Sequence, residues 1–267
     1  MSCHLHIDPF SGIAGDMFLG ALLDVGAPAD DVAAAFDDLP VRAQFELVIA
    51  RVQRHAIGAT DLKVRVVEKH HHHDHGHHHH HHHVHYPDLL AMVDALRTSD
   101  RARARARRIV DVLAQAEARV HGMPIEKVHF HEVGAVDSIV DMLGSAVAME
   151  LLNIDSVSAG PLPISRGFVK CQHGRMPVPA PATAYIMEGL PTVGVDREGE
   201  LVTPTGAAIV AAVADTFGPS PAMIVDKVGY GAGDRDDPDY PNLLRVFIGE
   251  RVNAKLANAE LQMPNAK

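Results

Sequence analysis

Residues 5–25 read LHIDPFSGIAGDMFLGALLDV, in which a short apolar run, a turn and an apolar helical pattern follow one another. The run predicts a strand over 5–8 that enters a turn at Pro9–Gly12. Apolar residues then recur at helical spacing, so we expect a helix over 14–25, ended by a glycine and a proline. Its core-facing residues are expected to be Met17, Phe18, Ala21, Leu22 and Val25.

The remainder of the chain predicts more strands and helices without a strict alternation. β-rich runs over 44–53 and 62–68, joined around Gly58, predict an antiparallel pair. Ser99 is expected to cap a long helix over 100–120. The predicted fold class is therefore α/β (mixed α+β), a mixed sheet with flanking helices that a flexible His-rich loop interrupts. The other expected elements are helices over 30–39, 86–96, 135–152, 181–188 and 205–217, and strands over 156–159, 167–171, 223–228 and 243–248.

The composition is that of an ordinary soluble globular chain. Its 267 residues are 47% hydrophobic and 22% charged, and the net charge of −10 argues against a nucleic-acid binder. Two cysteines provide no disulfide framework. The N-terminus lacks the pattern of a secretory signal, and no run reaches the roughly 18 apolar residues of a membrane span. We therefore expect a cytoplasmic protein that binds neither membranes nor nucleic acid.

A histidine tract interrupts the pattern: thirteen of the sixteen residues from 70 to 85 are histidine. Imidazole is a good ligand for nickel, copper, zinc and cobalt, and a segment so poor in apolar side chains is expected to be a flexible loop. A purification tag would lie at a terminus, whereas this tract is internal, so the tract favours metal handling. The candidate metal ligands are His70, His71, His72, His73, His75, His77, His78, His79, His80, His81, His82, His83 and His85.

The first candidate site follows the N-terminal strand. His4, His6 and Asp8 share one face of an extended strand, where they could hold a divalent ion, and Asp8 and Asp16 are the stronger candidates for catalysis. A glycine turn and the start of a helix favour an anion such as phosphate. The candidate ligand-binding residues of this turn are Ser11, Gly12 and Gly15.

The second candidate site is HFHE at 129–132, followed by two aspartates. His129 and His131 share a face if the backbone is extended. Asp137 and Asp141 share a face of the helix expected to follow. We interpret His129, His131 and Asp141 as metal ligands and Glu132 and Asp137 as acid–base residues, with a helix-dipole role for Asp137 as the alternative.

Basic and hydroxyl residues offer further contacts. Arg235 follows a glycine-rich turn and is a candidate phosphate or carboxylate clamp. His173 lies between turns and is equally compatible with a structural role. The threonines of TPTG at 203–206 could supply donors that face an anion. Five arginines spread over two sectors of one predicted helix, so a solvated face is favoured over a phosphate site; they are Arg101, Arg103, Arg105, Arg107 and Arg108.

Five stretches together closely resemble the nickel insertion proteins known as the LarC family. They read DPFSGIAGDMFLGALLDVG from residue 8, HFHEVGAVDSIVD from 129, HGRMPVPAPAT from 173, ELVTPTGAA from 200 and GYGAGDRDDPDYPNLLRVFIGE from 229. A histidine-rich insertion before the helical segment also resembles that family. The resemblance covers nearly the whole chain.

The resemblance implies insertion of Ni²⁺ into pyridinium-3,5-bisthiocarboxylic acid mononucleotide, which completes the nickel-pincer cofactor of lactate racemase-type enzymes. It also implies CTP and Mn²⁺ or Mg²⁺, which a C-terminal domain supplied elsewhere would bind. Formation of a carbon–nickel bond removes a ring proton, for which Glu132 or Asp137 is the candidate base. The substrate phosphate would suit the turn at 11–15 or Arg235.

The chain is accordingly expected to be the N-terminal part of a nickel-inserting lyase. Its expected partners are the precursor nucleotide, the C-terminal domain and the apo-enzyme that receives the cofactor, and a homo-oligomer is left open. The alternative is a nickel storage or delivery protein without catalysis. The expected division is an α/β segment over 1–69, the loop over 70–85, a helical and α/β segment over 86–252 of the same or a second domain, and a frayed tail over 253–267.

Overall fold

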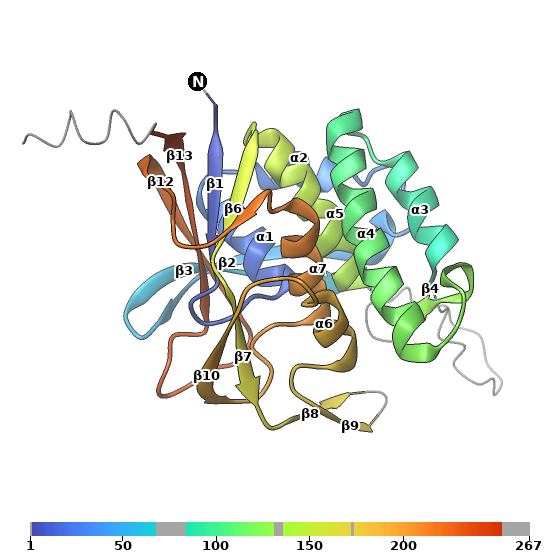
Figure 1. Ribbon diagram of the computed structural model, residues 1–267. Coiled ribbons are helices and arrows are strands. Elements are labelled where there is room, and N and C mark those ends of the chain that lie inside the picture. Colours follow the sequence, from blue (N-terminus) through green and yellow to red (C-terminus); the bar gives the residue numbers. More distant parts are fainter. Residues whose placement is uncertain (1, 68–83, 131–135, 172–173, 253–267) are drawn as a thin grey trace, which may run out of the picture.

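The computed structural model describes residues 2–67, 84–130, 136–171 and 174–252 (Figure 1). Within these ranges the chain has the mixed α and β architecture that the sequence predicted. No helix in the described ranges is both long and apolar enough to cross a membrane. Some residues with an expected role lie outside the described residues, namely the tract from His70 to His83, His131, Glu132, His173 and the expected tail over 253–267.

A seven-stranded mixed sheet forms one layer of the molecule. Its strands are β1 (His4–Asp8), β2 (Phe45–Arg54), β3 (Ile57–Val66), β6 (Ser156–Ala159), β11 (Thr216–Phe217), β12 (Met223–Ala232) and β13 (Leu243–Arg251). Their order is β11-β6-β1-β13-β12-β3-β2. β1 lies between β6, to which it is parallel, and β13, to which it is antiparallel. The first and last described strands of the chain are therefore hydrogen-bonded neighbours.

Helices form the second layer, to the right of the sheet in Figure 1. α1 (Gly15–Asp24) packs on β12 and β3, and α5 (Val136–Leu151) packs on α1. α4 (Asp100–His121) contacts both α5 and α7 (Pro204–Val213). The apolar residues expected to face the core from α1 are all buried, as are most residues of α5. The shorter helices are α2 (Ala29–Ala34), α3 (Tyr86–Ala95) and α6 (Pro181–Ile186), with 3₁₀ turns at Arg42–Gln44 and Ile125–Lys127.

Three small strand pairs lie outside the main sheet. β7 (Leu162–Arg166) runs parallel to β10 (Thr192–Glu198), and β8 (Phe168–Cys171) pairs with β9 (Gly174–Pro177). β4 (Val84–His85) pairs with β5 (His129–Phe130). Only β8 was expected from the sequence. β4 and β5 have only two residues each, and β7, β9 and β10 contain a proline or a glycine, so none of them shows the alternating pattern that reveals a strand.

The turn of the hairpin between β2 and β3 is not where the sequence predicted it. The two strands pair antiparallel, but their turn lies at His55 and Ala56, not at Gly58, which is paired with Gln53 inside β3. His55 and Ala56 have φ of 48° and 65°. Two positive φ values suit a two-residue hairpin turn, although glycine or asparagine is the usual occupant, and the sequence signal therefore pointed to the wrong residue.

Several other boundaries differ from the expected ones. The helix expected over 30–39 ends at Ala34, and the helix expected over 205–217 ends at Val213. β11 then adds an edge strand to the sheet, which the apolar pattern of the preceding helix concealed. Val84 and His85, expected to belong to the loop, form β4. Among the arginines of α4, Arg105 is buried and donates to the Ile154 carbonyl, so the expected solvated face is wrong at this residue.

Candidate functional site

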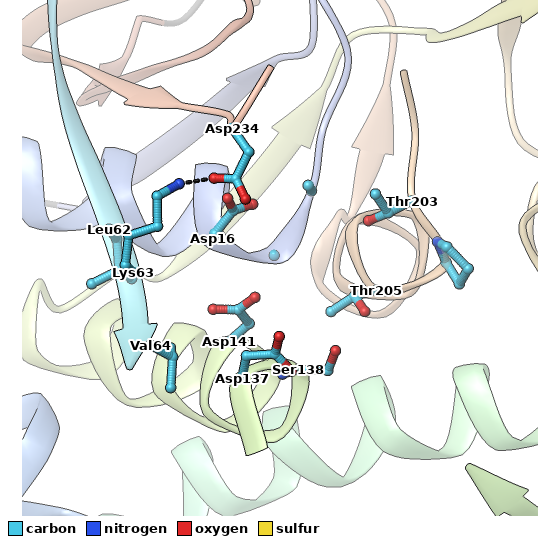
Figure 2. Close-up of a pocket in the computed structure, with 13 residues that line it drawn as sticks. Asp16, Leu62, Lys63, Val64, Asp137, Ser138, Asp141, Thr203, Thr205 and Asp234 are labelled. Atoms are coloured by element: carbon cyan, nitrogen blue, oxygen red, sulfur yellow. Dashed lines mark hydrogen bonds and ion pairs between the residues drawn. The ribbon is translucent and has the colours of Figure 1, made fainter. Parts of the chain in front are cut away.

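Three helices begin at the wall of one pocket of about 380 Å³ (Figure 2). Asp16 lies in the first turn of α1, Asp137 in the first turn of α5, and Thr205 in the first turn of α7. The opposite wall comes from residues 62–64 of β3 and from Asp234, which follows β12. This site is called the acidic pocket below. Its lining residues are Ala14, Gly15, Asp16, Leu62, Lys63, Val64, Asp137, Ser138, Asp141, Thr203, Pro204, Thr205 and Asp234.

Backbone contacts hold the starts of α1 and α7 together. The Ile13 N–H donates to the Leu201 carbonyl at 2.8 Å, and the Thr203 N–H donates to the Ile13 carbonyl at 3.1 Å. Thr203 then caps α7, because its hydroxyl accepts from the Gly206 N–H at 3.1 Å. Two segments that are far apart in the sequence thus bring their helix N-termini to one place. Each N-terminus carries a partial positive charge, which favours anionic groups in the acidic pocket.

Asp141 is the most deeply buried carboxyl of the pocket, with a relative exposure of 8%. The Asp16 backbone N–H donates to its carboxylate, so Asp141 of α5 interacts with the first turn of α1. The second carboxylate oxygen, Oδ1, is buried without a hydrogen-bond partner among the described residues. Burial raises the pKa of Asp141 well above its ordinary value, and the charges of Asp16 and Asp137 raise it further.

Gly15 provides the space for this contact. A Cβ at residue 15 would lie 2.6 Å from the Asp141 Cβ, 2.8 Å from its Oδ2 and 2.9 Å from the Thr205 Cγ2. These separations are much shorter than ordinary van der Waals contact. Glycine at this position therefore allows α1, α5 and α7 to approach one another with the buried carboxylate between them.

Asp16 faces the same space from α1. Burial raises its pKa, although the Met17 N–H, which donates to Oδ1 at 2.8 Å, and the Lys63 ammonium both act in the opposite direction. Two neighbouring carboxyls with raised pKa values are typical of sites that accept or release protons near neutral pH. The Asp16–Asp141 pair therefore identifies a candidate site for proton transfer.

Lys63 provides the positive charge at the edge of the acidic pocket. Its ammonium forms ion pairs with Asp234 and, at 3.0 Å, with Asp61. Figure 2 shows Lys63 extending from β3 towards Asp234, with Asp141 on the far side of the pocket. The lysine therefore neutralises the carboxylates at one side of the pocket and leaves the buried Asp141 oxygen unpaired.

A second pocket of about 420 Å³ adjoins the first and shares Ala14, Asp16, Thr203 and Asp234 with it. Lys170 and Arg235 line this second pocket. Arg235 donates to the Glu200 carbonyl at 2.6 Å, and its own carbonyl accepts from Asn242 at 3.1 Å. The clamp expected from Arg235 thus lies beside the acidic pocket, with part of its guanidinium held by the backbone.

The structure brings together residues from both candidate sites of the sequence. Gly15 and Asp16 from the first lie next to Asp137 and Asp141 from the second. Asp137 is at the pocket wall, where its carboxylate accepts from the Ser138 N–H at 2.7 Å. The two sequence blocks are more than a hundred residues apart, so their spacing gave no indication of this contact.

Other expected site residues lie elsewhere. Asp8 accepts two hydrogen bonds from Arg245, at 2.6 and 2.9 Å, on the neighbouring strand. The Ser11 hydroxyl accepts from Arg197 at 2.7 Å. Gly12 has a φ of 110° and packs against the Leu201 carbonyl. The N-terminal turn is thus filled by the chain itself, and none of these three residues lines the acidic pocket as described.

His4 and His6 are buried on β1 and bond to serines of β6. The His4 ring contacts Ser156 at 2.7 Å and Ser158 at 2.8 Å, and the His6 Nδ1 contacts Ser158 at 2.8 Å. Burial is the main cause that lowers the pKa of both histidines. Both rings are therefore held neutral between strands, an arrangement that suits a structural role.

Two other imidazoles lie next to each other beside the histidine tract. His85 of β4 pairs with His129 of β5 in the strand register, and their ring centroids are 4.4 Å apart. Within the described parts of the chain, no three histidine, cysteine, aspartate or glutamate side chains are grouped closely enough to hold a metal ion by themselves. His85 and His129 are nonetheless two expected metal ligands whose rings lie side by side in the structure.

Sequence reasoning did not identify Lys63 or Ser138 as residues of the site, and it named Asp234 only as part of the glycine-rich stretch before Arg235. Lys63 is a charged residue in a strand of alternating pattern. Solvent-facing lysines are common in such strands, so its presence did not indicate a site. Their role depends on which strand ends meet the three helix starts, a property of the tertiary fold.

The whole described site lies in a region that matches one protein family. The family model described as nickel insertion protein matches residues 5–264. A relative from Geobacillus kaustophilus, named pyridinium-3,5-bisthiocarboxylic acid mononucleotide nickel insertion protein, is 45% identical over 93% of this chain. Relatives from Citrifermentans bemidjiense and Geobacter metallireducens, named provisionally for nickel insertion, are 47% and 49% identical over 94% and 92% of it.

The chain spans about three fifths of the length of these curated relatives, 60% for Geobacillus kaustophilus and Geobacter metallireducens and 62% for Citrifermentans bemidjiense. No solved structure matches it. The family match extends over nearly all of the chain and includes every residue that lines the acidic pocket. The chain therefore belongs to the nickel insertion protein family.

Proposed function

We propose that this chain takes part in the insertion of Ni²⁺ into pyridinium-3,5-bisthiocarboxylic acid mononucleotide, with the acidic pocket as the reaction site. The observation that carries this proposal is the 45% identity to a relative named for that reaction. The pocket supports it, because it brings carboxyl groups with raised pKa values to the starts of three helices. CTP and Mn²⁺ or Mg²⁺ belong to the proposal on the resemblance alone, as does the assignment of the chain as an N-terminal part.

Nickel is a substrate in this scheme, and the chain's own residues collect it. Imidazoles are good ligands for nickel, and the His85 and His129 rings lie beside each other next to the histidine tract. His129 is separated from Asp137 by only a few residues of chain. We propose that nickel passes from imidazole ligands towards the acidic pocket, with His131 and Glu132, outside the described residues, as candidates along that path.

Formation of a carbon–nickel bond releases the proton of the ring carbon, so the pocket needs a group that accepts it. Asp137 is our candidate, because it lies at the pocket wall and is less buried than Asp141. The carbon's electron pair goes to nickel and the proton goes to the carboxylate, so the step is balanced without an oxidant. A positioned carboxylate base contributes about 10²–10⁴-fold to the rate of such a step.

The substrate also carries a phosphate. The second pocket, with Lys170 and Arg235, opens from the same wall and supplies two cationic side chains. Arginine binds phosphate through several parallel hydrogen bonds, although part of the Arg235 guanidinium is already bonded to the Glu200 carbonyl. We propose that the nucleotide phosphate lies where the two pockets meet, between Arg235 and the start of α7, whose capping residue Thr203 lines both pockets, while the pyridinium ring faces the acidic pocket.

Product formation from the purified precursor nucleotide tests the proposal. The nickel-loaded chain is assayed alone and with the separately expressed C-terminal domain of a longer relative, each with and without CTP. Product from the chain alone would locate catalysis within its residues. Product only from the combination, and only with CTP, would make it the nickel-holding part of a split enzyme.

No product in any arrangement, with nickel bound, would contradict the proposal and favour nickel storage or delivery. The histidine tract favours this second candidate function, because storage requires only the tract. A variant that lacks residues 70–85 separates the two. Retained turnover at saturating nickel would make the tract an accessory reservoir, and lost turnover would make it part of the delivery path.

A further inference from the structure

The donor atoms of the acidic pocket differ from those of the histidine tract. Among the described residues that line the pocket, the polar side chains end in oxygen, apart from Lys63. They are the carboxyls of Asp16, Asp137, Asp141 and Asp234 and the hydroxyls of Ser138, Thr203 and Thr205. Carboxylate, hydroxyl and water oxygens suit hard cations such as Mg²⁺ and Mn²⁺, whereas imidazoles suit nickel.

A cluster of carboxylates alone would not indicate a ligand, but Asp141 adds an independent observation. Its relative exposure is 8%, and its buried Oδ1 has no hydrogen-bond partner among the described residues. The hydrogen bond from the Asp16 N–H to this carboxylate leaves Oδ1 unpaired among the described residues. Figure 2 shows the Asp141 carboxylate pointing from α5 into the space below Asp16. A buried oxygen of this kind is costly unless a cation or a proton satisfies it.

Lys63 does not fill this role. Its ammonium is engaged with Asp234 and Asp61 at the edge of the pocket. The other carboxylates whose charges act on Asp141 are those of Asp16 and Asp137. The pocket therefore has a resident positive charge at one side and an unpaired buried carboxylate oxygen at the other.

The described residues provide too few grouped ligands to enclose an ion completely. That is the usual arrangement for Mg²⁺, which keeps several waters and is held by one or two carboxylates together with the phosphate of a ligand. Thr203, which caps α7, and Thr205, in its first turn, line the same pocket as Asp16 and Asp141. A helix N-terminus favours a phosphate group, so the same pocket combines partners for a cation and for its anion.

We propose that Asp16 and Asp141 hold a hard divalent cation, Mg²⁺ or Mn²⁺, whose open coordination positions accept a phosphate oxygen of the bound ligand beside the start of α7. The site is separate from the imidazoles that bind nickel. The inference goes beyond nickel insertion, because the cation site stands whatever reaction the pocket performs. Its test measures cation binding alone, so its failure is distinguishable from failure of the proposed function.

The test is a Mn²⁺ titration of the full chain, with free Mn²⁺ measured by electron paramagnetic resonance. Mg²⁺ is then added, because it competes for oxygen ligands but not for imidazoles, and the Mg²⁺-displaceable fraction reports the acidic pocket. The variants are Asp141→Asn and Asp16→Asn, two isosteric changes that keep the fold testable if one of them unfolds. The control is Asp196→Asn, which removes a carboxylate whose side chain is 86% exposed and pairs with Arg166.

We expect the unaltered chain and Asp196→Asn to bind the same Mg²⁺-displaceable Mn²⁺. Asp141→Asn and Asp16→Asn should each weaken it by a factor on the order of ten or more, because affinity follows the charge of the ligands. Thermal unfolding of each variant establishes that it is folded. Displaceable Mn²⁺ that is absent from the unaltered chain, or unchanged in either pocket variant, would overturn the proposal.

A second titration in the presence of inorganic phosphate tests the open positions. Phosphate should increase the Mn²⁺ affinity of the unaltered chain and increase that of Asp141→Asn much less, because the variant holds more weakly the cation to which phosphate would bind. An equal effect of phosphate on both proteins would mean that it acts on Mn²⁺ in solution, and that result would contradict the phosphate part of the proposal.

Discussion

Gly15 lacks a side chain, and this absence makes room for the Asp141 carboxylate in the acidic pocket. The buried carboxylate reaches the first turn of α1 only because position 15 leaves room for it. The same carboxylate accepts the Asp16 N–H, one of the backbone donors that a helix N-terminus leaves unpaired. The acidic pocket therefore depends on the close approach of α5 to Gly15 as much as on its charged groups.

Substitution of Gly15 by alanine should therefore destabilise the fold. The added Cβ would lie within 3 Å of both Asp141 and Thr205, so the three helices would have to separate. Overpacking of this kind costs about 1–3 kcal/mol of unfolding free energy. Urea denaturation of the variant measures the loss.

Gly194→Ala is the matched control for that measurement. A Cβ at residue 194 meets no atom within 4 Å, and this glycine also lies in a secondary-structure element, β10. Its unfolding free energy should change by no more than about 0.5 kcal/mol, as for ordinary exposed substitutions. An equal loss in the two variants would show that close packing at Gly15 is not the cause.

The strand β1 alternates residues of the apolar core with two buried histidines. Leu5 and Ile7 are buried in the main core, while His4 and His6 alternate with them and bond to Ser156 and Ser158 of the parallel strand β6. Charged groups near the two rings are Asp8, Asp215, Arg245 and Arg251. The pKa of each histidine is lowered, mainly by burial, so protonation opposes this strand pairing.

Stability should consequently fall as the pH drops below the ordinary histidine pKa of about 6.5. The unfolded chain takes up protons there while the folded histidines stay neutral, so unfolding becomes more favourable until the lowered folded pKa is passed. Above about pH 6.5 this contribution is constant. In the double variant His4→Asn/His6→Asn the slope of unfolding free energy against pH should be smaller across this window.

His55→Asn provides the control, because His55 is exposed and asparagine tolerates its positive φ of 48°. The slope of the double variant should also be smaller than that of His55→Asn, in which both buried histidines remain. The interpretation of the two buried histidines would be wrong if the double variant kept the full slope.

The start of α7 is the second element on which the pocket depends. The Thr203 hydroxyl accepts from the Gly206 N–H, and the Thr203 N–H binds the Ile13 carbonyl. Thr203→Ala should cost about 0.5–2 kcal/mol of unfolding free energy, whereas Thr203→Ser keeps the capping oxygen and most of the stability. Equal stability of the alanine and serine variants in thermal unfolding would contradict the capping role.

Elements with regular patterns were predictable, and those without them were not. The helical spacing in 14–25 and the Ser99 cap located α1 and α4 within one or two residues. The hairpin turn was predicted at Gly58 and lies at His55 and Ala56, because these two residue types seldom adopt positive φ. β7, β9 and β10 were missed because short strands among prolines and glycines carry no periodic signal.

Strand order in the main sheet and helix packing on it together determine which candidate residues meet. The sequence identified Asp16, Asp137 and Asp141 as separate candidates, and the packing of α1 against α5 joins them. Asp8 was also a candidate, but the antiparallel pairing of β1 with β13 places it opposite Arg245. Lys63 could not be predicted, because its role arises from strand order and not from neighbouring sequence.

If nickel insertion takes place in the acidic pocket, substitution of the pocket carboxylates should lower the rate of insertion. Asp137→Asn and Asp16→Asn are compared with the exposed control Asp196→Asn in whichever arrangement gives product, with bound nickel measured in each. The account predicts a fall of about 10²-fold or more for Asp137→Asn, a clear loss for Asp16→Asn, and unchanged nickel loading. Insertion at the rate of the unaltered chain in both pocket variants would contradict it.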